Sequence, residues 1–170
     1  ASWDADSSTL TLQKDVSITE TVGILSSITL ELNGHQLDWP VASNTSGNPL
    51  IATEADTTLT VQDSSTTQTG RLVAEKSNVF QAQGDIILRS GTVESKASDI
   101  FYQYGSGALT IQGGVVVAAQ GSTIVSSDDV AYVHITGGTF NVLPDEESVE
   151  DGYTVVLIGE SYQALPNDKL

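Results

Sequence analysis

The chain has 170 residues, of which 22 are acidic and only 6 are basic, so its formal net charge is −16. A polyanion is repelled by phosphate backbones and by anionic lipid surfaces, which argues against nucleic-acid and membrane-surface partners. Cysteine is absent, which excludes disulfides and thiol chemistry, and no apolar run approaches the roughly 20 residues of a membrane-spanning helix. Methionine is absent even at position 1, so we expect the chain to be one module of a larger protein.

Residues 1–27 predict an irregular first coil that caps the N-terminal end of the fold. Apolar and polar residues alternate over short stretches at 10–12 and 16–18, which is the pattern of short strands. Helical periodicity is scarce along the whole chain, and Thr, Ser, Val, Ile and Gly dominate its composition. The sequence therefore predicts an all-β fold.

Residues 28–143 contain an internal repeat. One template occurs five times: two apolar residues separated by one position, then a small turn pair, then another apolar residue. Residues 64–69 read as an insertion in the second copy. The second apolar position recurs at intervals of 29, 27, 23 and 24 residues, in the range of solenoid repeats. The two apolar positions are Leu30 and Leu32, Leu59 and Val61, Ile86 and Leu88, Leu109 and Ile111, and Val133 and Ile135.

Further apolar strands recur between these marks, so we expect three short strands in each repeat. Each strand would lie parallel to its equivalent in the next repeat, at a separation of about 4.8 Å, with matching apolar side chains in columns. Glycine pairs, Asn33–Gly34 and Asp63–Ser64 would turn the chain at one corner, since Gly, Asn and Asp tolerate left-handed backbone. The predicted architecture is a right-handed parallel β-helix, a solenoid of about five to six coils.

Residues 144–170 break the template and predict an acidic loop followed by a C-terminal capping hairpin. The segment Ile-Gly-Glu-Ser-Tyr at 158–162 has a glycine-containing turn, and such a hairpin would cover the open end of the core. We therefore expect residues 1–170 to form a single domain. The competing fold is an antiparallel β-sandwich, which also uses many short strands but does not predict one residue class at one phase of each repeat.

Four segments carry a family resemblance: residues 10–18, 28–37, 135–140 and 151–155. Together they resemble the pectate-lyase-like β-helix modules of large surface proteins from Gram-positive bacteria. The resemblance covers roughly residues 8 to 156 and implies a secreted or wall-bound parent protein. It implies little about activity, because these modules are adhesin-like or carbohydrate-associated segments.

Three tyrosines are candidates for a carbohydrate-binding platform. Tyr102 and Tyr104 follow a predicted strand at Phe101, and Tyr132 precedes the strand one coil later. Flat aromatic faces stack on sugar rings, and nearby Gln, Asn and Asp side chains bond hydroxyl groups. The alternative is that Phe101 or Tyr102 fills the core, because the phase of that strand is ambiguous.

The acidic residues provide candidate metal ligands but no catalytic group. Asp145, Glu146 and Glu147 lie in an oxygen-rich loop of the kind that binds Ca²⁺, although no EF-hand spacing is present. Asp128 and Asp129 are adjacent, and adjacent residues on a strand point to opposite faces, so they read as solvated turn acids. We therefore predict no catalytic residue and no cofactor other than a possible Ca²⁺.

These observations favour a non-catalytic extracellular module of a bacterial cell-surface protein, acting as a stalk or in adhesion. The expected partners are glycans or host surface proteins. The alternative is a carbohydrate-binding module, and a polysaccharide lyase or hydrolase is the third reading. The chain lacks the long insertions that usually form the walls of a polysaccharide cleft, which disfavours that third reading.

Overall fold

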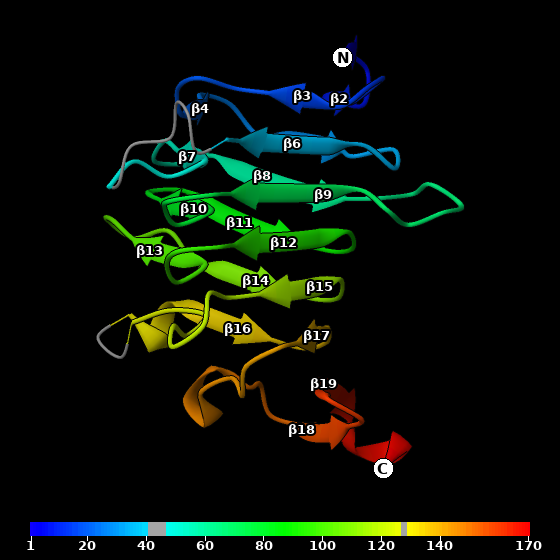
Figure 1. Ribbon diagram of the computed structural model, residues 1–170, viewed down its shortest axis with the longest axis vertical. Coiled ribbons are helices and arrows are strands. Elements are labelled where there is room, and N and C mark those ends of the chain that lie inside the picture. The colour runs from blue at the N-terminus through cyan, green and yellow to red at the C-terminus, as the bar shows by residue number, and fades with distance from the viewer. Residues whose placement is uncertain (41–46, 127–128) are drawn as a thin grey trace.

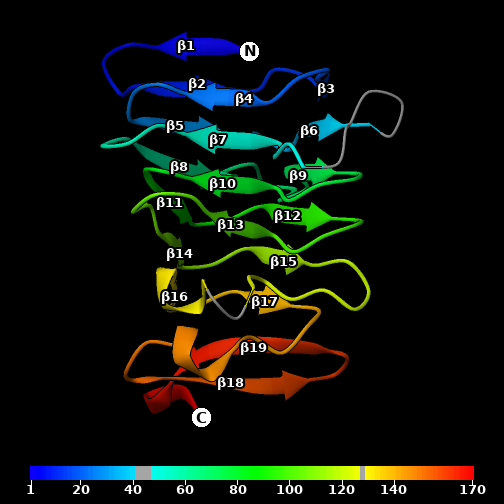
Figure 2. The same cartoon turned by 90° about the vertical axis from the view of Figure 1, so that its left-hand side faces the viewer.

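The computed structural model describes residues 1–40, 47–126 and 129–170. These residues form three β-sheets and three short 3-10 helices, η1 (Val130–Tyr132), η2 (Glu146–Ser148) and η3 (Asn167–Lys169). The strands lie one above another from the N-terminal end to the C-terminal end of the molecule (Figures 1 and 2). The predicted all-β character is confirmed.

The three sheets are named A, B and C here. Sheet A has the order β1 (Ser2–Asp4), β2 (Thr9–Thr11), β5 (Ile28–Glu31), β8 (Thr58–Gln62), β11 (Asp85–Leu88), β14 (Leu109–Ile111) and β16 (Val133–Ile135). Sheet C has the order β13 (Phe101–Gln103), β10 (Phe80–Ala82), β7 (Ile51–Thr53) and β4 (Val22–Ile24). Sheet B has the order β18 (Tyr153–Ile158), β19 (Ser161–Pro166), β17 (Thr139–Phe140), β15 (Val115–Val117), β12 (Thr92–Ser95), β9 (Arg71–Ala74), β6 (Gln36–Trp39) and β3 (Val16–Ser17).

From β2 to β15 the chain visits sheets A, B and C in turn, and one such round is called a pass here. Each strand from β2 to β12 pairs in parallel with the strand three places later, and β14 and β15 pair in parallel with β16 and β17. In sheet A, for example, β2 pairs with β5, β5 with β8 and β8 with β11. An isolated parallel bridge between Phe101 and Val125 continues sheet C by one step. Because an antiparallel sandwich has no such pairing, the competing fold is excluded.

The sequence predicts that the apolar pairs of the five repeats lie side by side in sheet A. The observed register confirms this for three of the four neighbouring pairs of repeats and corrects the first. Leu59, Ile86, Leu109 and Val133 lie side by side, as do their partners two residues later. In the first step, however, Val61 lies beside Leu30 rather than Leu32, and Leu59 lies beside Ile28. The alignment at Leu32 is wrong because the corner before β6 is longer than the later corners: Leu37 comes seven positions after Leu30, whereas Val93 comes five positions after Leu88. Leu32 fills that longer corner with no exposed surface.

A buried carboxylate organises the same corner. The Asp63 side chain is only 2% exposed. It accepts hydrogen bonds from the backbone N–H groups of Gly34 at 2.9 Å, Ser65 at 3.1 Å and Gly70 at 2.6 Å. Burial alone would raise the pKa of this carboxyl, but its hydrogen bonds outweigh burial and lower the pKa below its ordinary value. Asn33 does adopt left-handed backbone at φ +52°, whereas Asp63 does not, so Asp63 acts as an acceptor and not as a turn-former.

The glycine pairs of the later corners have two distinct roles. Gly114 and Gly138 have φ values of +81° and +103°, which confirms the expected left-handed turn. Gly137 is needed for a different reason, because a Cβ there would lie 2.2 Å from the carbonyl oxygen of Gln112 in the preceding pass. Close approach of successive passes therefore requires the first glycine, and chain reversal requires the second. At Gly114 both reasons apply, because a Cβ there would also lie 2.6 Å from the carbonyl oxygen of Gly91.

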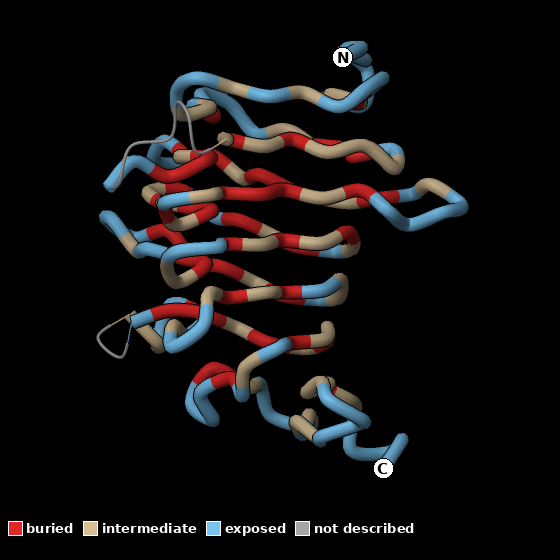
Figure 3. Tube along the Cα trace, in the orientation of Figure 1, coloured by how far each residue is buried: buried red, intermediate tan, exposed pale blue. Residues whose placement is uncertain are grey.

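The inward-facing rows of the three sheets form one continuous hydrophobic core (Figure 3). Sheet B contributes Val16, Leu37, Leu72, Val93, Val116 and Phe140 in register. Sheet C contributes Val22, Ile51, Phe80 and Phe101. Fully burying a side chain of this size stabilises the fold by about 1.5–3 kcal/mol. The rows therefore hold neighbouring passes together.

The two ends differ from the middle. At the N-terminal end, β1 pairs antiparallel with β2, while β2, β3 and β4 are already in parallel register with the next pass. At the C-terminal end, β18 and β19 form the predicted hairpin, with a turn at Gly159 and Glu160, and β19 pairs antiparallel with β17. Among the described residues, no helix has the length and apolar character needed to cross a membrane.

Candidate functional site

Two of the three candidate tyrosines share one surface of sheet C. Phe101 is buried, whereas Tyr102 is 48% exposed and Tyr104 is 52% exposed. Because side chains alternate along a strand, Tyr102 and Tyr104 both point outward and Phe101 points into the core. The ambiguous phase of β13 is thereby resolved in favour of surface tyrosines.

A pocket of about 300 Å³ lies beside Tyr102, lined by Gly47, Pro49, Asn78, Gln81 and Tyr102. Gln81 is the in-register neighbour of Tyr102 on β10, so an amide lies next to the aromatic ring. The Asn78 side-chain amide donates to the backbone oxygen of Asp99 at 3.0 Å, a bond that does not use its own carbonyl oxygen. The pocket thus combines a flat ring, a proline and two carboxamides.

Tyr132 lies elsewhere. It ends the short helix η1, which leads into β16 of sheet A, and it is 37% exposed. It does not line the pocket beside Tyr102. The structure therefore brings together Tyr102 and Tyr104 on one face but does not place Tyr132 in the same pocket.

The acidic calcium candidates have a local structural role. Asp145 precedes helix η2, and its carboxylate accepts a hydrogen bond from the Glu147 backbone N–H at 3.0 Å. Within residues 1–40, 47–126 and 129–170, no three His, Asp or Glu side chains gather closely enough to hold a metal ion. Asp145, Glu146 and Glu147 therefore do not form a metal cluster. Asp129 accepts from the Ser126 hydroxyl at 3.1 Å, and Asp128 lies outside the described residues.

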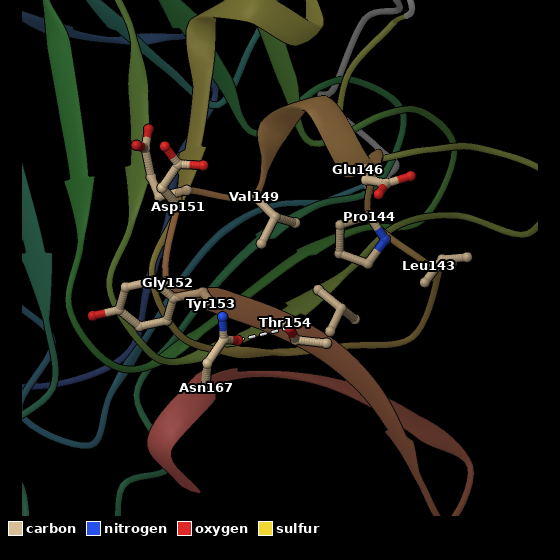
Figure 4. A pocket seen from close by; sticks show the side chains of 11 residues that line it. Leu143, Pro144, Glu146, Val149, Asp151, Gly152, Tyr153, Thr154 and Asn167 are labelled. Carbon is tan, nitrogen blue, oxygen red and sulfur yellow. Dashed lines mark hydrogen bonds between the residues drawn. The ribbon is translucent and has the colours of Figure 1, made fainter. Parts of the chain in front are cut away.

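The sequence did not indicate a second hollow, a groove of about 570 Å³ between the η2 segment and the start of β18 (Figure 4). Leu143, Pro144, Val149 and Val155 supply its apolar surface. The η2 segment is held against the preceding pass, because Val149 forms a parallel bridge with Ile135 and the Ser148 hydroxyl donates to the backbone oxygen of Val130.

Acidic side chains surround this groove. Glu146, Glu150 and Asp151 line it, and no Lys or Arg among the described residues does. Glu150 pairs with His134, with 2.6 Å between its carboxylate oxygen and the ring Nδ1. Glu146 and Asp151 take part in none of the ion pairs formed within the described part of the chain.

Strand β18, whose first three residues line this groove, contains an unusual apolar run. Val155, Val156, Leu157 and Ile158 form a continuous apolar run, which normally indicates a strand buried on both faces. In the structure Leu157 is 62% exposed and Ile158 is 48% exposed. The run therefore offers apolar surface to the solvent.

The chain matches no protein-family model, no curated protein and no solved structure. The resemblance to pectate-lyase-like surface modules thus remains a prediction from the residues.

Proposed function

We propose that this chain is a right-handed parallel β-helix of the pectate-lyase-like type and that it serves as a non-catalytic extracellular module of a bacterial cell-surface protein. In this role it is a stiff stalk or spacer that presents an adhesive surface to glycans or host proteins. The right hand is the one that parallel crossover connections almost always take.

The in-register rows carry this proposal. Six successive strands of sheet A, from β2 to β16, pair in parallel, and the same apolar side chains stack from one pass to the next. Bending the molecule along this direction would stretch ladder hydrogen bonds and open the core on one side. A continuous ladder of this kind therefore suits a spacer.

Pulling the chain by its two ends tests the spacer role. We expect one cooperative unfolding event, because every pass shares its core with its neighbours. Gradual extension at low force would contradict the proposal.

Incubation with polyuronides and Ca²⁺ tests the non-catalytic role, since a lyase would release an unsaturated product that absorbs in the ultraviolet.

Carbohydrate binding is the second candidate, and the pocket beside Tyr102 favours it. The Tyr102 ring provides a stacking surface, and Gln81 and Asn78 provide amide groups next to it. A glycan array with Tyr102→Ala tests this function, with Tyr132→Ala as a matched control on an exposed tyrosine outside the pocket. Binding that Tyr102→Ala abolishes and Tyr132→Ala keeps supports a sugar site. An array on which the unaltered chain binds no glycan would remove it.

A further inference from the structure

We infer that the C-terminal groove and strand β18 together form a docking site for an extended peptide segment of another polypeptide, one that alternates basic and apolar residues. This inference goes beyond the spacer role and the sugar pocket and depends on neither. It combines three observations: an unpaired strand edge, an apolar groove beside it, and acidic residues around the groove.

Strand β18 is an edge strand with no protection. In the described part of the chain it ends the strand order of sheet B and pairs with β19 alone. Among the described residues, Val155 to Ile158 make no backbone hydrogen bond outside the hairpin. Natural sheets protect such edges with charged side chains, proline or bulges, but Tyr153–Ile158 contains no charge and no proline. Its free N–H and C=O groups can therefore accept a further strand.

The groove beside β18 would select which side chains an added strand can carry. Its apolar lining residues Val149 and Val155 face a volume of about 570 Å³, which accommodates side chains of an added strand. Side chains of a strand alternate between its two faces, so one set of the added segment would enter the groove while the other would meet the rim. Tyr153 and Pro144 extend the apolar surface at either side (Figure 4).

The acidic residues around the groove favour a positively charged partner. The rim residues Glu146, Glu150 and Asp151 are acidic, and the chain as a whole carries −16. Two copies joined along β18 would bring these acids together, and like charges facing each other disfavour that pairing. A segment with Lys or Arg on alternate positions would instead pair with Glu146 and Asp151. The complementary partner is therefore a basic, apolar strand and not a second copy.

Five synthetic peptides test the inference by fluorescence anisotropy against the whole chain at low salt. The first alternates Lys and Val over six residues, the second replaces Lys by Glu, and the third replaces Val by Ser. The fourth and fifth are the first peptide with backbone N-methyl groups on alternate residues, in the two possible settings. We expect binding of the Lys-Val peptide, and binding at least about tenfold weaker for the Glu and Ser peptides. One N-methyl setting should bind and the other should not, because only one edge of the peptide meets β18.

A charge variant locates the site. We expect the double variant Glu146→Gln with Asp151→Asn to weaken Lys-Val binding about fivefold or more, whereas Asp6→Asn with Glu20→Gln, at the N-terminal end, leaves it unchanged. All four positions are exposed, so the fold should tolerate both changes. Equal binding of the Lys-Val and Lys-Ser peptides, equal binding in both N-methyl settings, or equal effects of the two double variants would overturn the inference. So would self-association of the chain that the Lys-Val peptide fails to compete away.

Discussion

The corner between sheets A and B is built in two different ways along the molecule. In the later passes the first inward residue of sheet B comes five positions after the last inward residue of sheet A, as from Leu88 to Val93 or from Ile111 to Val116. In the two earlier passes the separation is seven, from Leu30 to Leu37, and eleven, from Val61 to Leu72. Both kinds of corner nevertheless deliver the next strand in parallel register.

The difference shows that register is fixed by the inward rows and not by the length of the corner. The short corners rely on glycine, which admits the close approach of successive passes. The long corners are closed by the side chains of Leu32 and Asp63, which fill the extra volume and pair the extra backbone N–H groups. The following changes test this distinction, from the largest expected effect to the smallest.

Replacing Ile111 by Asp should be the most damaging change, with a loss of at least about 4 kcal/mol in the free energy of unfolding. Ile111 has no exposed surface and lies in the row between Leu88 and Ile135, so the variant buries an unpaired charge. Urea denaturation measures the loss. The matched control is Thr110→Asp, one residue away on the outward face, which should be close to neutral. Equal stability of Ile111→Asp and the unaltered chain would show that the inward-facing rows do not hold the passes together.

Gly137→Ala should cost about 2–3 kcal/mol because its new Cβ would meet the Gln112 carbonyl oxygen of the preceding pass at 2.2 Å. Gly121→Ala provides the comparison, since no atom of the described residues lies within 4 Å of a Cβ there and its cost comes from a φ of +82°. We expect Gly137→Ala to lower the urea midpoint more than Gly121→Ala does. The reverse order would contradict the role of close approach at Gly137.

Asp63→Ala should cost about 2 kcal/mol because it leaves the N–H groups of Gly34, Ser65 and Gly70 without their acceptor. The Gly34 contact joins two neighbouring passes. Hydrogen exchange should therefore show faster exchange at Gly34 and Gly70 in the variant, with the later corners unaffected. Unchanged exchange at both amides would rule out the proposed closing role of Asp63.

Low pH should reduce the stability that Asp63 contributes to the fold. Its pKa is lower in the folded chain than the ordinary value of 3.8, so the ionised group stabilises the fold above about pH 4. That stabilisation is lost as the pH falls from the unfolded pKa through the lower folded pKa. The difference in Tm between the unaltered chain and Asp63→Ala should consequently be wide at pH 7 and narrow at pH 2.5. A constant difference would mean that charge plays no part.

Deleting residues 64–69 should have the smallest effect, below about 1 kcal/mol, because the loop lies at the surface. The deletion joins Asp63 to Gly70 and places Leu72 five positions after Val61, which is the spacing of the later corners. Gly70 can adopt the positive φ that Gly91 has at the equivalent turn. Thermal melting measures the change, and loss of soluble expression would contradict it.

The candidate sites were predictable to different degrees. The tyrosines could be singled out, but whether Phe101 or Tyr102 faces the core required the register of sheet C. The acidic run at 145–147 could be found, but its capping of η2 depends on local geometry that composition does not reveal. The groove beside β18 was missed because a continuous apolar run normally indicates a buried strand, and its position at the end of sheet B exposes it.

The sequence by itself determined the all-β class, the phase of the repeat from β8 onward, the glycine turns and the C-terminal hairpin. Each of these follows from local alternation, spacing or turn chemistry, which are properties of nearby residues. Only the tertiary structure decided that Leu30 and not Leu32 lies beside Val61, that Asp63 serves Gly34 of the preceding pass, and that β18 keeps a free edge. These features depend on which distant strands lie side by side. The register of each strand is set by the packing of all the inward-facing rows together, and nearby residues do not determine that packing.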